Sequence, residues 1–211
     1  MNNVIFVSGI HTDTGKSYAT GWLARRLMDE GKSVATLKFI QTGNVGSSED
    51  IAVHRRLMGV ELPEDAEGIT APQIFSYPCS PQLAARLDSR SIDFEKIDAA
   101  IALLSERYDV VLVEGAGGLM VPLTDDFWTI DYVASRSLPV IIVTNGTLGS
   151  INHTLLSFEA VERRAIPLHS VIYNTHFDSS DATIADDTVG FIRRYLQRRH
   201  PQTPLLVCPS L

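Results

Sequence analysis

The sequence lacks any apolar run that approaches the roughly 20 residues needed to cross a bilayer. Its N-terminus also lacks the basic and apolar stretches of a secretory signal, so we expect a cytoplasmic protein with no membrane partner. Cysteine is scarce as well. Cys79 and Cys208 fit no metal-binding spacing, which indicates free thiols in a reducing compartment.

Positive charge is limited too, because 18 lysines and arginines stand against 25 aspartates and glutamates, for a net charge of −7. The basic pairs Arg193-Arg194 and Arg198-Arg199 are interpreted as a solvated helix face. We therefore expect no nucleic-acid partner, and a small-molecule enzyme is compatible with this balance. The length suits one α/β domain spanning residues 1–211, and no internal repeat is present.

Continuous apolar runs recur along the chain, which is typical of strands buried on both faces of a parallel sheet. Strands are predicted at Val4–Val7, Ser33–Leu37, Val110–Val113, Val140–Thr144 and Val171–Tyr173, with a weaker one at Leu205–Val207. Helical patterns lie at Lys16–Glu30, Asp50–Met58, Pro81–Leu87, Phe94–Arg107, Thr129–Arg136, Ile151–Arg164 and Ala182–Arg199, and Glu61–Gln73 is predicted to be irregular. The alternation predicts an α/β fold of the P-loop NTPase type, with a doubly wound, mostly parallel sheet and helices on both faces.

The first predicted strand leads directly into a phosphate-binding pattern, Ser8–Ser17, which ends in Gly-Lys-Ser at a helix start. Backbone N–H groups at such a loop, together with the dipole of the following helix, favour a polyphosphate. Lys16 would reach the β- and γ-phosphates, and the Ser17 hydroxyl would ligate Mg²⁺. The first glycine of the strict pattern is displaced by one position, to Gly9.

Other chemically suggestive side chains follow the remaining strands at their carboxyl ends, where open parallel sheets bind ligands. Glu114 ends an apolar strand where a nucleoside triphosphatase holds its metal, although it could instead cap the next turn. Asp50 could bind metal or stabilise a helix N-terminus. Lys38 would add a second cation beside the phosphate loop, but its position alone equally fits an ordinary surface lysine. His11 and His153 receive no catalytic role.

Five segments resemble the dethiobiotin synthetase family in order and spacing. They are Ser8–Ser17, Leu37–Gly43, Ser80–Ala85, Val113–Leu123 and Leu148–His153. The resemblance implies an ATP-dependent cyclo-ligase of biotin biosynthesis, which carboxylates 7,8-diaminopelargonate with CO₂, phosphorylates the carbamate and closes a cyclic urea. The family is homodimeric, so the resemblance also implies a homodimer.

The resemblance further implies roles for individual residues. Lys38 and Lys16 would be catalytic, and Mg²⁺ would be bound by Ser17, Asp50 and Glu114. Contacts to ATP are implied for Asp13, Thr14, Gly15, Lys16, Ser17, Tyr18, Asp50, Glu114, Gly115, Ala116, Gly117, Asn174 and Thr175. Contacts to the other substrate are implied for Thr12, Thr42, Gly149, Ser150 and Asn152.

The C-terminal part departs from the family pattern, because Leu206–Pro209 stands where an adenine contact of the form Gly-x-x-Pro is expected. The sequence therefore leaves nucleotide base selectivity open. Two alternative functions were weighed. Another ATP-dependent synthetase of the same branch would need a glutamine-hydrolysing domain for which this chain has no room. A partitioning or positioning ATPase would carry its signature lysine at the position of His11.

Overall fold

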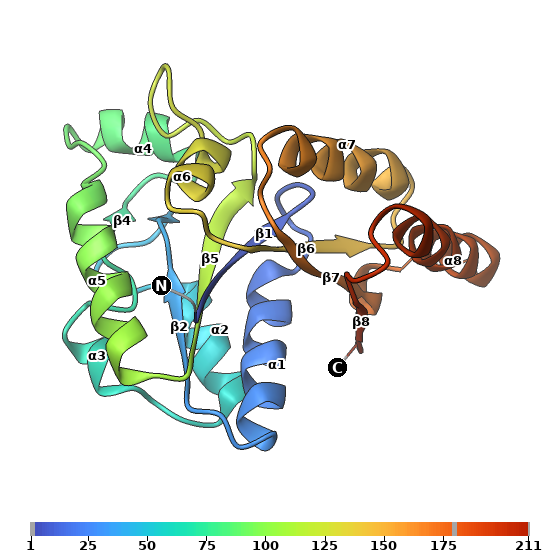
Figure 1. Ribbon diagram of the computed structural model, residues 1–211. Coiled ribbons are helices and arrows are strands. Elements are labelled where there is room, and N and C mark those ends of the chain that lie inside the picture. Colours follow the sequence, from blue (N-terminus) through green and yellow to red (C-terminus); the bar gives the residue numbers. More distant parts are fainter. Residues whose placement is uncertain (1–2, 179–180, 211) are drawn as a thin grey trace.

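The structure is a computed structural model that describes residues 3–178 and 181–210. Within these ranges six strands form the central sheet: β1 (Val4–Gly9), β2 (Val34–Lys38), β5 (Val110–Gly118), β6 (Val140–Asn145), β7 (Leu168–Asn174) and β8 (Leu205–Cys208). Their order is β2-β5-β1-β6-β7-β8, and every neighbouring pair is parallel. The predicted α/β fold is confirmed (Figure 1).

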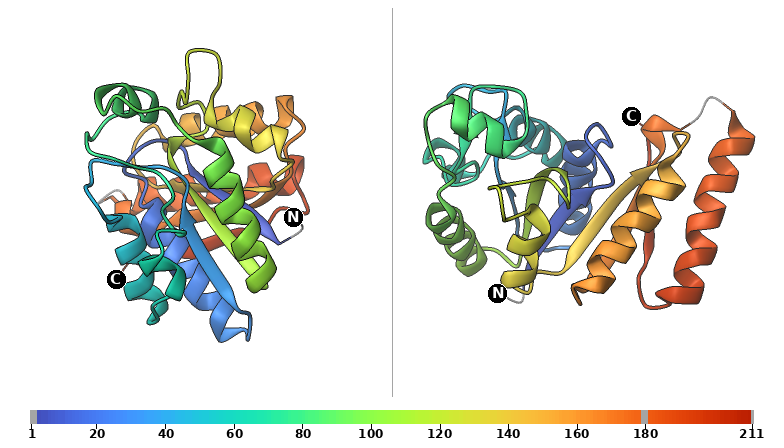
Figure 2. Two further views of the ribbon diagram at one scale, coloured as in Figure 1. Left: turned by 90° about the vertical axis from the view of Figure 1, so that its left-hand side faces the viewer. Right: turned by 90° about the horizontal axis from the view of Figure 1, so that it is seen from above.

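Helices cover both faces of the sheet (Figure 2). They are α1 (Lys16–Asp29), α2 (Glu49–Met58), α3 (Pro63–Ala66), α4 (Pro81–Leu87), α5 (Phe94–Arg107), α6 (Thr129–Ser135), α7 (Ser150–Arg163) and α8 (Ala182–Arg199). The two faces form separate cores because successive strand residues point to opposite sides. Phe6 packs in the core of α5 to α8, whereas its neighbour Val7 packs in the core of α1 and α2.

Two short elements between the large ones were not predicted from the sequence. The segment Glu61–Gln73, predicted to be irregular, contains the one-turn helix α3. A two-stranded parallel sheet joins β3 (Gln41–Thr42) to β4 (Ile74–Phe75). Strands of two residues carry no periodicity, so only long-range pairing reveals them. This small sheet fixes the chain that follows Lys38.

β5 is longer than predicted and continues through the glycine segment to Gly118. A side chain at Gly115 would meet the ring of Phe6 at 2.8 Å, so the close approach of β5 to β1 requires glycine there. In the described ranges, no α-helix combines the length and apolarity needed to span a bilayer.

Both cysteines are free, as expected from the sequence. Cys208 is the last residue of β8 and is buried in the core, and this burial raises the pKa of its thiol to about 12. Cys79 is only partly buried. The thiolate is the reactive form, so the two residues should differ in reactivity.

We predict that one thiol per folded chain reacts rapidly with a disulfide reagent at pH 8, and two per unfolded chain. The reason is that Cys208 stays protonated and inaccessible until the fold opens. Absorbance of the released thiolate measures both counts. In Cys79→Ser the fast phase should disappear, and a fast phase that survives in this variant would contradict the assignment.

Candidate functional site

The phosphate loop connects β1 to α1, and two glycines determine its shape. Gly15 adopts φ +75°, a left-handed conformation that suits glycine, immediately before the first helical residue. A Cβ atom at Gly9 would clash with the Thr14 hydroxyl and lie 2.9 Å from the His11 carbonyl oxygen. The displaced glycine of the sequence pattern is therefore the residue that lets the loop fold back on itself. Lys16 Nζ crosses this loop and donates a hydrogen bond to the His11 carbonyl at 3.1 Å.

A buried ion cluster lies beside the loop, where β2 ends against the middle of β5. The register of these strands places Lys38 opposite Glu114. Lys38 Nζ lies 2.8 Å from Glu114 Oε1 and 2.6 Å from Asp50 Oδ2, and it donates to the Gly115 carbonyl at 3.1 Å. Lys38 is only 4% exposed and Glu114 is fully buried. The interpretation of Lys38 as an ordinary surface lysine is therefore wrong.

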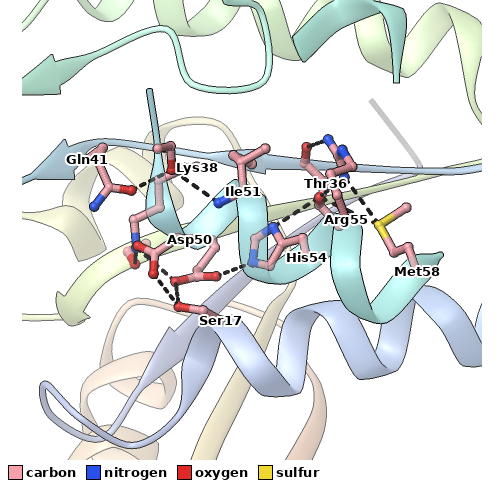
Figure 3. A network of polar contacts seen from close by, with 12 residues as sticks. Ser17, Thr36, Lys38, Gln41, Asp50, Ile51, His54, Arg55 and Met58 are labelled. Atoms are coloured by element: carbon pink, nitrogen blue, oxygen red, sulfur yellow. Dashed lines mark hydrogen bonds and ion pairs between the residues drawn. The ribbon is translucent and has the colours of Figure 1, made fainter. Parts of the chain in front are cut away.

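Three side chains that carry oxygen ligands for a metal meet at this cluster. Ser17 Oγ lies 2.6 Å from Asp50 Oδ1 (Figure 3). It lies 3.0 Å from Glu114 Oε1. Hydroxyl and carboxylate oxygens are the ligands that Mg²⁺ prefers, and Mg²⁺ normally keeps several waters and phosphate oxygens. In the described part of the chain no three His, Cys, Asp or Glu side chains group as a metal site. The residues present thus fit Mg²⁺ bound together with a nucleotide better than a metal held by protein alone.

Charge pairing keeps Lys38 and Glu114 ionised despite their burial. Burial alone lowers the pKa of Lys38, but Glu114 and Asp50 outweigh it and raise that pKa above its ordinary value. Burial likewise raises the pKa of Glu114, and Lys38 and His54 reverse this to a value well below the usual range. Lys16 lacks such a close partner, so burial and repulsion from Lys38 lower its pKa to about 8.

Predicted residues from several segments line one cavity of about 500 Å³ at the loop. Its lining is Thr12, Asp13, Gly15, Lys16, Ser17, Lys38, Ile40, Gln41, Thr42, Asp50, Glu114, Ala116, Gly117 and Phe177. A second cavity of about 430 Å³ shares Thr12, Thr42, Ala116 and Gly117 with the first. Pro78, Cys79, Ser80, Pro81, Val121 and Pro122 complete the second cavity. Two adjoining cavities suit a reaction between a nucleotide and a second small molecule.

Other predicted residues lie outside this lining. Tyr18 is half-buried on α1, Thr14 is buried beneath the loop, and the Gly115 carbonyl accepts from Lys38. The Asn174 amide donates to the Thr14 carbonyl at 3.2 Å, and the Thr175 hydroxyl donates to the Cys208 carbonyl at 3.1 Å. The ATP contacts of Asn174 and Thr175 therefore stay predictions.

The segment around the N-terminus of α7 lies apart from both cavities within one chain. Ser150 donates to Asn145 Oδ1 at 2.6 Å, which fixes the start of the helix. Gly149, Ser150 and Asn152 line neither cavity described above. A third cavity of about 320 Å³ lies between this helix and the loop, and His11 and His153 both line it. The predicted substrate contacts of this segment thus stay predictions.

Sequence reasoning missed three polar side chains behind the cluster: Thr36, His54 and Arg55. His54 is fully buried, and its Nε2 lies 2.6 Å from Glu114 Oε2. One signal was available, since His54 follows Asp50 by four residues and therefore shares a helix face with it. Thr36 lies inside an apolar strand, where nothing in the local pattern marks it as part of a site.

The loop, the parallel strand order and the carboxylates of Asp50 and Glu114 beside the loop define a P-loop nucleoside triphosphatase. Residues 3–205 match the family described as "AAA domain". A ParA family ATPase from Chlorobium tepidum has the same fold at 15% identity, with a TM-score of 0.55 over 100% of this chain and 86% of that chain. A plasmid partition protein from Borrelia burgdorferi matches at 12% identity and TM-score 0.58, over 99% and 87%. These likenesses show the fold alone.

Sequence comparison then defines the particular family, and the chain belongs to the dethiobiotin synthetases. It is 50% identical over 204 residues to "ATP-dependent dethiobiotin synthetase BioD 2" of Pasteurella multocida, covering 96% of this chain and 95% of the relative. It is 46% identical to the corresponding BioD protein of Chlorobaculum tepidum, over 92% and 82%. The family predicted from the sequence is confirmed.

We predict that Gly9→Ala weakens nucleotide binding by about 10-fold or more, because overpacking a tight site costs roughly 1–3 kcal/mol. Titration calorimetry with ADP measures the effect. The double variant Gly9→Ala/Thr14→Ala removes the nearest clash but not the one with the His11 carbonyl, so it should recover only part of the affinity. Wild-type affinity in the single variant would contradict this account of the loop.

Proposed function

We propose that this chain catalyses the ATP-dependent carboxylation and ring closure of 7,8-diaminopelargonate with CO₂ to dethiobiotin, ADP and phosphate. Its membership of the dethiobiotin synthetase family supports this reaction. One observation supports the assignment of this chemistry to particular residues. The buried ammonium of Lys38 stands between Asp50 and Glu114 in the cavity of the phosphate loop, and Thr42 links that cavity to the second one.

The reaction has three covalent steps. One substrate amine attacks CO₂, a C–N bond forms and a proton leaves, which yields a carbamate anion. A carbamate oxygen attacks the γ-phosphorus of ATP and ADP leaves. The second amine then attacks the carbonyl carbon of this mixed anhydride, phosphate leaves and the cyclic urea closes. The middle step brings two anions together, so the site must supply positive charge where they meet.

Two lysines supply that charge in the proposed mechanism. Lys16 would bind the β- and γ-phosphates from the loop, and Lys38 would approach the carbamate and the transferring phosphoryl group from the end of β2. Mg²⁺, held by Ser17, Asp50 and Glu114, would neutralise phosphate charge when bound. The pKa of Lys16 is lowered to about 8, so its charged form lacks a stabilising anion. A bound phosphate would supply that anion.

The second cavity is proposed to hold the diamine, with Thr12 and Thr42 as contacts on the side of the nucleotide. A homodimer is part of the proposal. Gly149, Ser150 and Asn152 line neither cavity of their own chain. The N–H groups at the start of α7 would instead bind the substrate carboxylate in the partner subunit. Leu148, next to this helix start, is 93% exposed.

Phosphate release tests the function directly. We expect release from ATP to require both diaminopelargonate and bicarbonate, and the product to be a cyclic urea identified by mass spectrometry. Assays that omit either substrate serve as controls. ATP turnover that does not depend on diaminopelargonate would contradict the proposal. It would favour the alternative of a partitioning or positioning ATPase, which otherwise rests on fold likeness alone.

Lys38→Ala tests the role of the second lysine. We expect kcat to fall by about 10²–10³, the usual effect of removing one group that stabilises transition-state charge. Nucleotide should still bind, because Lys16 and the loop amides remain. Lys32→Ala, an exposed lysine outside the site, is the matched control. Retained turnover in Lys38→Ala, with Lys32→Ala also active, would remove Lys38 from the mechanism.

A further inference from the structure

Glu114 uses its two carboxylate oxygens in different directions. Oε1 faces Ser17 and Lys38, at 3.0 Å and 2.8 Å. Oε2 faces away from them and lies 2.6 Å from Nε2 of His54. Rotation of the carboxylate plane would break this contact, so the contact at Oε2 fixes the orientation of the carboxylate and holds its other oxygen toward Ser17 and Lys38. Both Glu114 and His54 are fully buried, so water does not compete for this contact.

The hydrogen atoms along this contact can be assigned from donor and acceptor capacity. An ionised carboxylate only accepts, so Nε2 of His54 must carry a hydrogen. Nδ1 lies 3.0 Å from the Thr36 hydroxyl oxygen. That oxygen accepts a hydrogen bond from Arg55 Nη1 at 2.8 Å. Because a guanidinium only donates, the Thr36 hydroxyl hydrogen is left for Nδ1 or for the Met58 sulfur, which lies 3.9 Å from the hydroxyl oxygen. In either arrangement, Nε2 of His54 donates to Glu114 Oε2.

The outer end of this chain is also fixed. Arg55 Nε and Nη2 form a bidentate ion pair with Asp65, at 2.7 Å and 2.9 Å. Asp65 in turn accepts from the Thr70 hydroxyl at 2.6 Å and from the Leu62 backbone at 3.1 Å. His54 and Arg55 are neighbours on α2, and Thr36 comes from β2 (Figure 3). A continuous hydrogen-bonded path thus runs from α3 through β2 and α2 to the carboxylate of β5.

We propose that His54 is a positioning residue for the Mg²⁺–nucleotide site: its Nε2–H holds Glu114 Oε2, so that Oε1 faces Ser17 and Lys38. Thr36, which Arg55 holds in place, acts through His54, because its contact with Nδ1 fixes the orientation of the ring. This inference rests on the proposed role of Glu114 as a metal ligand. Residues that orient metal ligands in this way typically change metal affinity by 10–100-fold when removed.

Two substitutions separate positioning from simple packing. His54→Gln keeps an N–H donor near the place of Nε2, whereas His54→Leu fills the space without a donor. Binding of Mn²⁺ in the presence of ADP, measured by electron paramagnetic resonance, reports the site without turnover. We expect His54→Leu to weaken Mn²⁺ affinity by about 10-fold or more and His54→Gln to retain most of it. His169→Leu makes the same change at an exposed histidine and is the matched control.

Metal-free ADP binding and thermal unfolding are measured on each variant. Intact ADP binding beside weakened Mn²⁺ binding in His54→Leu supports the proposal. Mn²⁺ affinity that is unchanged in His54→Leu overturns it. Equal losses of affinity in both variants also overturn it, because donation to Oε2 would then not be what matters.

The tautomer provides a second test that needs no variant, in case His54→Leu fails to fold. Nitrogen NMR of the imidazole distinguishes hydrogen on Nε2 from hydrogen on Nδ1. Hydrogen on Nε2 supports the proposal, and a neutral ring with hydrogen on Nδ1 overturns it. All of these measurements omit diaminopelargonate. A failed phosphate-release assay would therefore contradict the proposed function without affecting them.

Discussion

The ion cluster of Lys38, Asp50 and Glu114 is the interaction on which the rest of the site depends. Removing a charge from water costs several kcal/mol unless it is paired and hydrogen-bonded. Lys38 is 4% exposed and meets this condition with two carboxylates and the Gly115 carbonyl. The pairing keeps Lys38 and Glu114 ionised. It therefore provides, in one place, a cation for phosphoryl transfer and oxygens for a metal.

The sheet places these charges with accuracy because its strands are parallel and in register. Lys38 and Glu114 are direct neighbours across β2 and β5. On the face behind them, α1 and α2 pack in the same core, which brings Ser17 and Asp50 to the cluster. His54, one turn after Asp50 on α2, reaches the far oxygen of Glu114. The same helix thus carries a proposed metal ligand and the residue that orients another.

Much of the fold and part of the site could be predicted from the sequence, because their signals are local. Apolar runs such as Val4–Val7 indicate buried strands wherever they occur. The phosphate loop is a continuous segment, so its residues predict their own proximity. Even its irregular feature, Gly9, has a local cause, because a Cβ atom at this position would clash with the Thr14 hydroxyl. The role of Lys38, in contrast, stayed open between a surface lysine and a second cation.

The sequence by itself determined the order of strands and helices, the phosphate loop and the resemblance to the dethiobiotin synthetases. Only the tertiary structure decided which side chains meet. Lys38 and Glu114 are 76 residues apart, and His54 and Glu114 are 60 apart. Their contacts arise from strand register and helix packing, which no local periodicity encodes. For that reason the sequence left Lys38 ambiguous and did not indicate His54, whereas the folded chain buries both against one carboxylate.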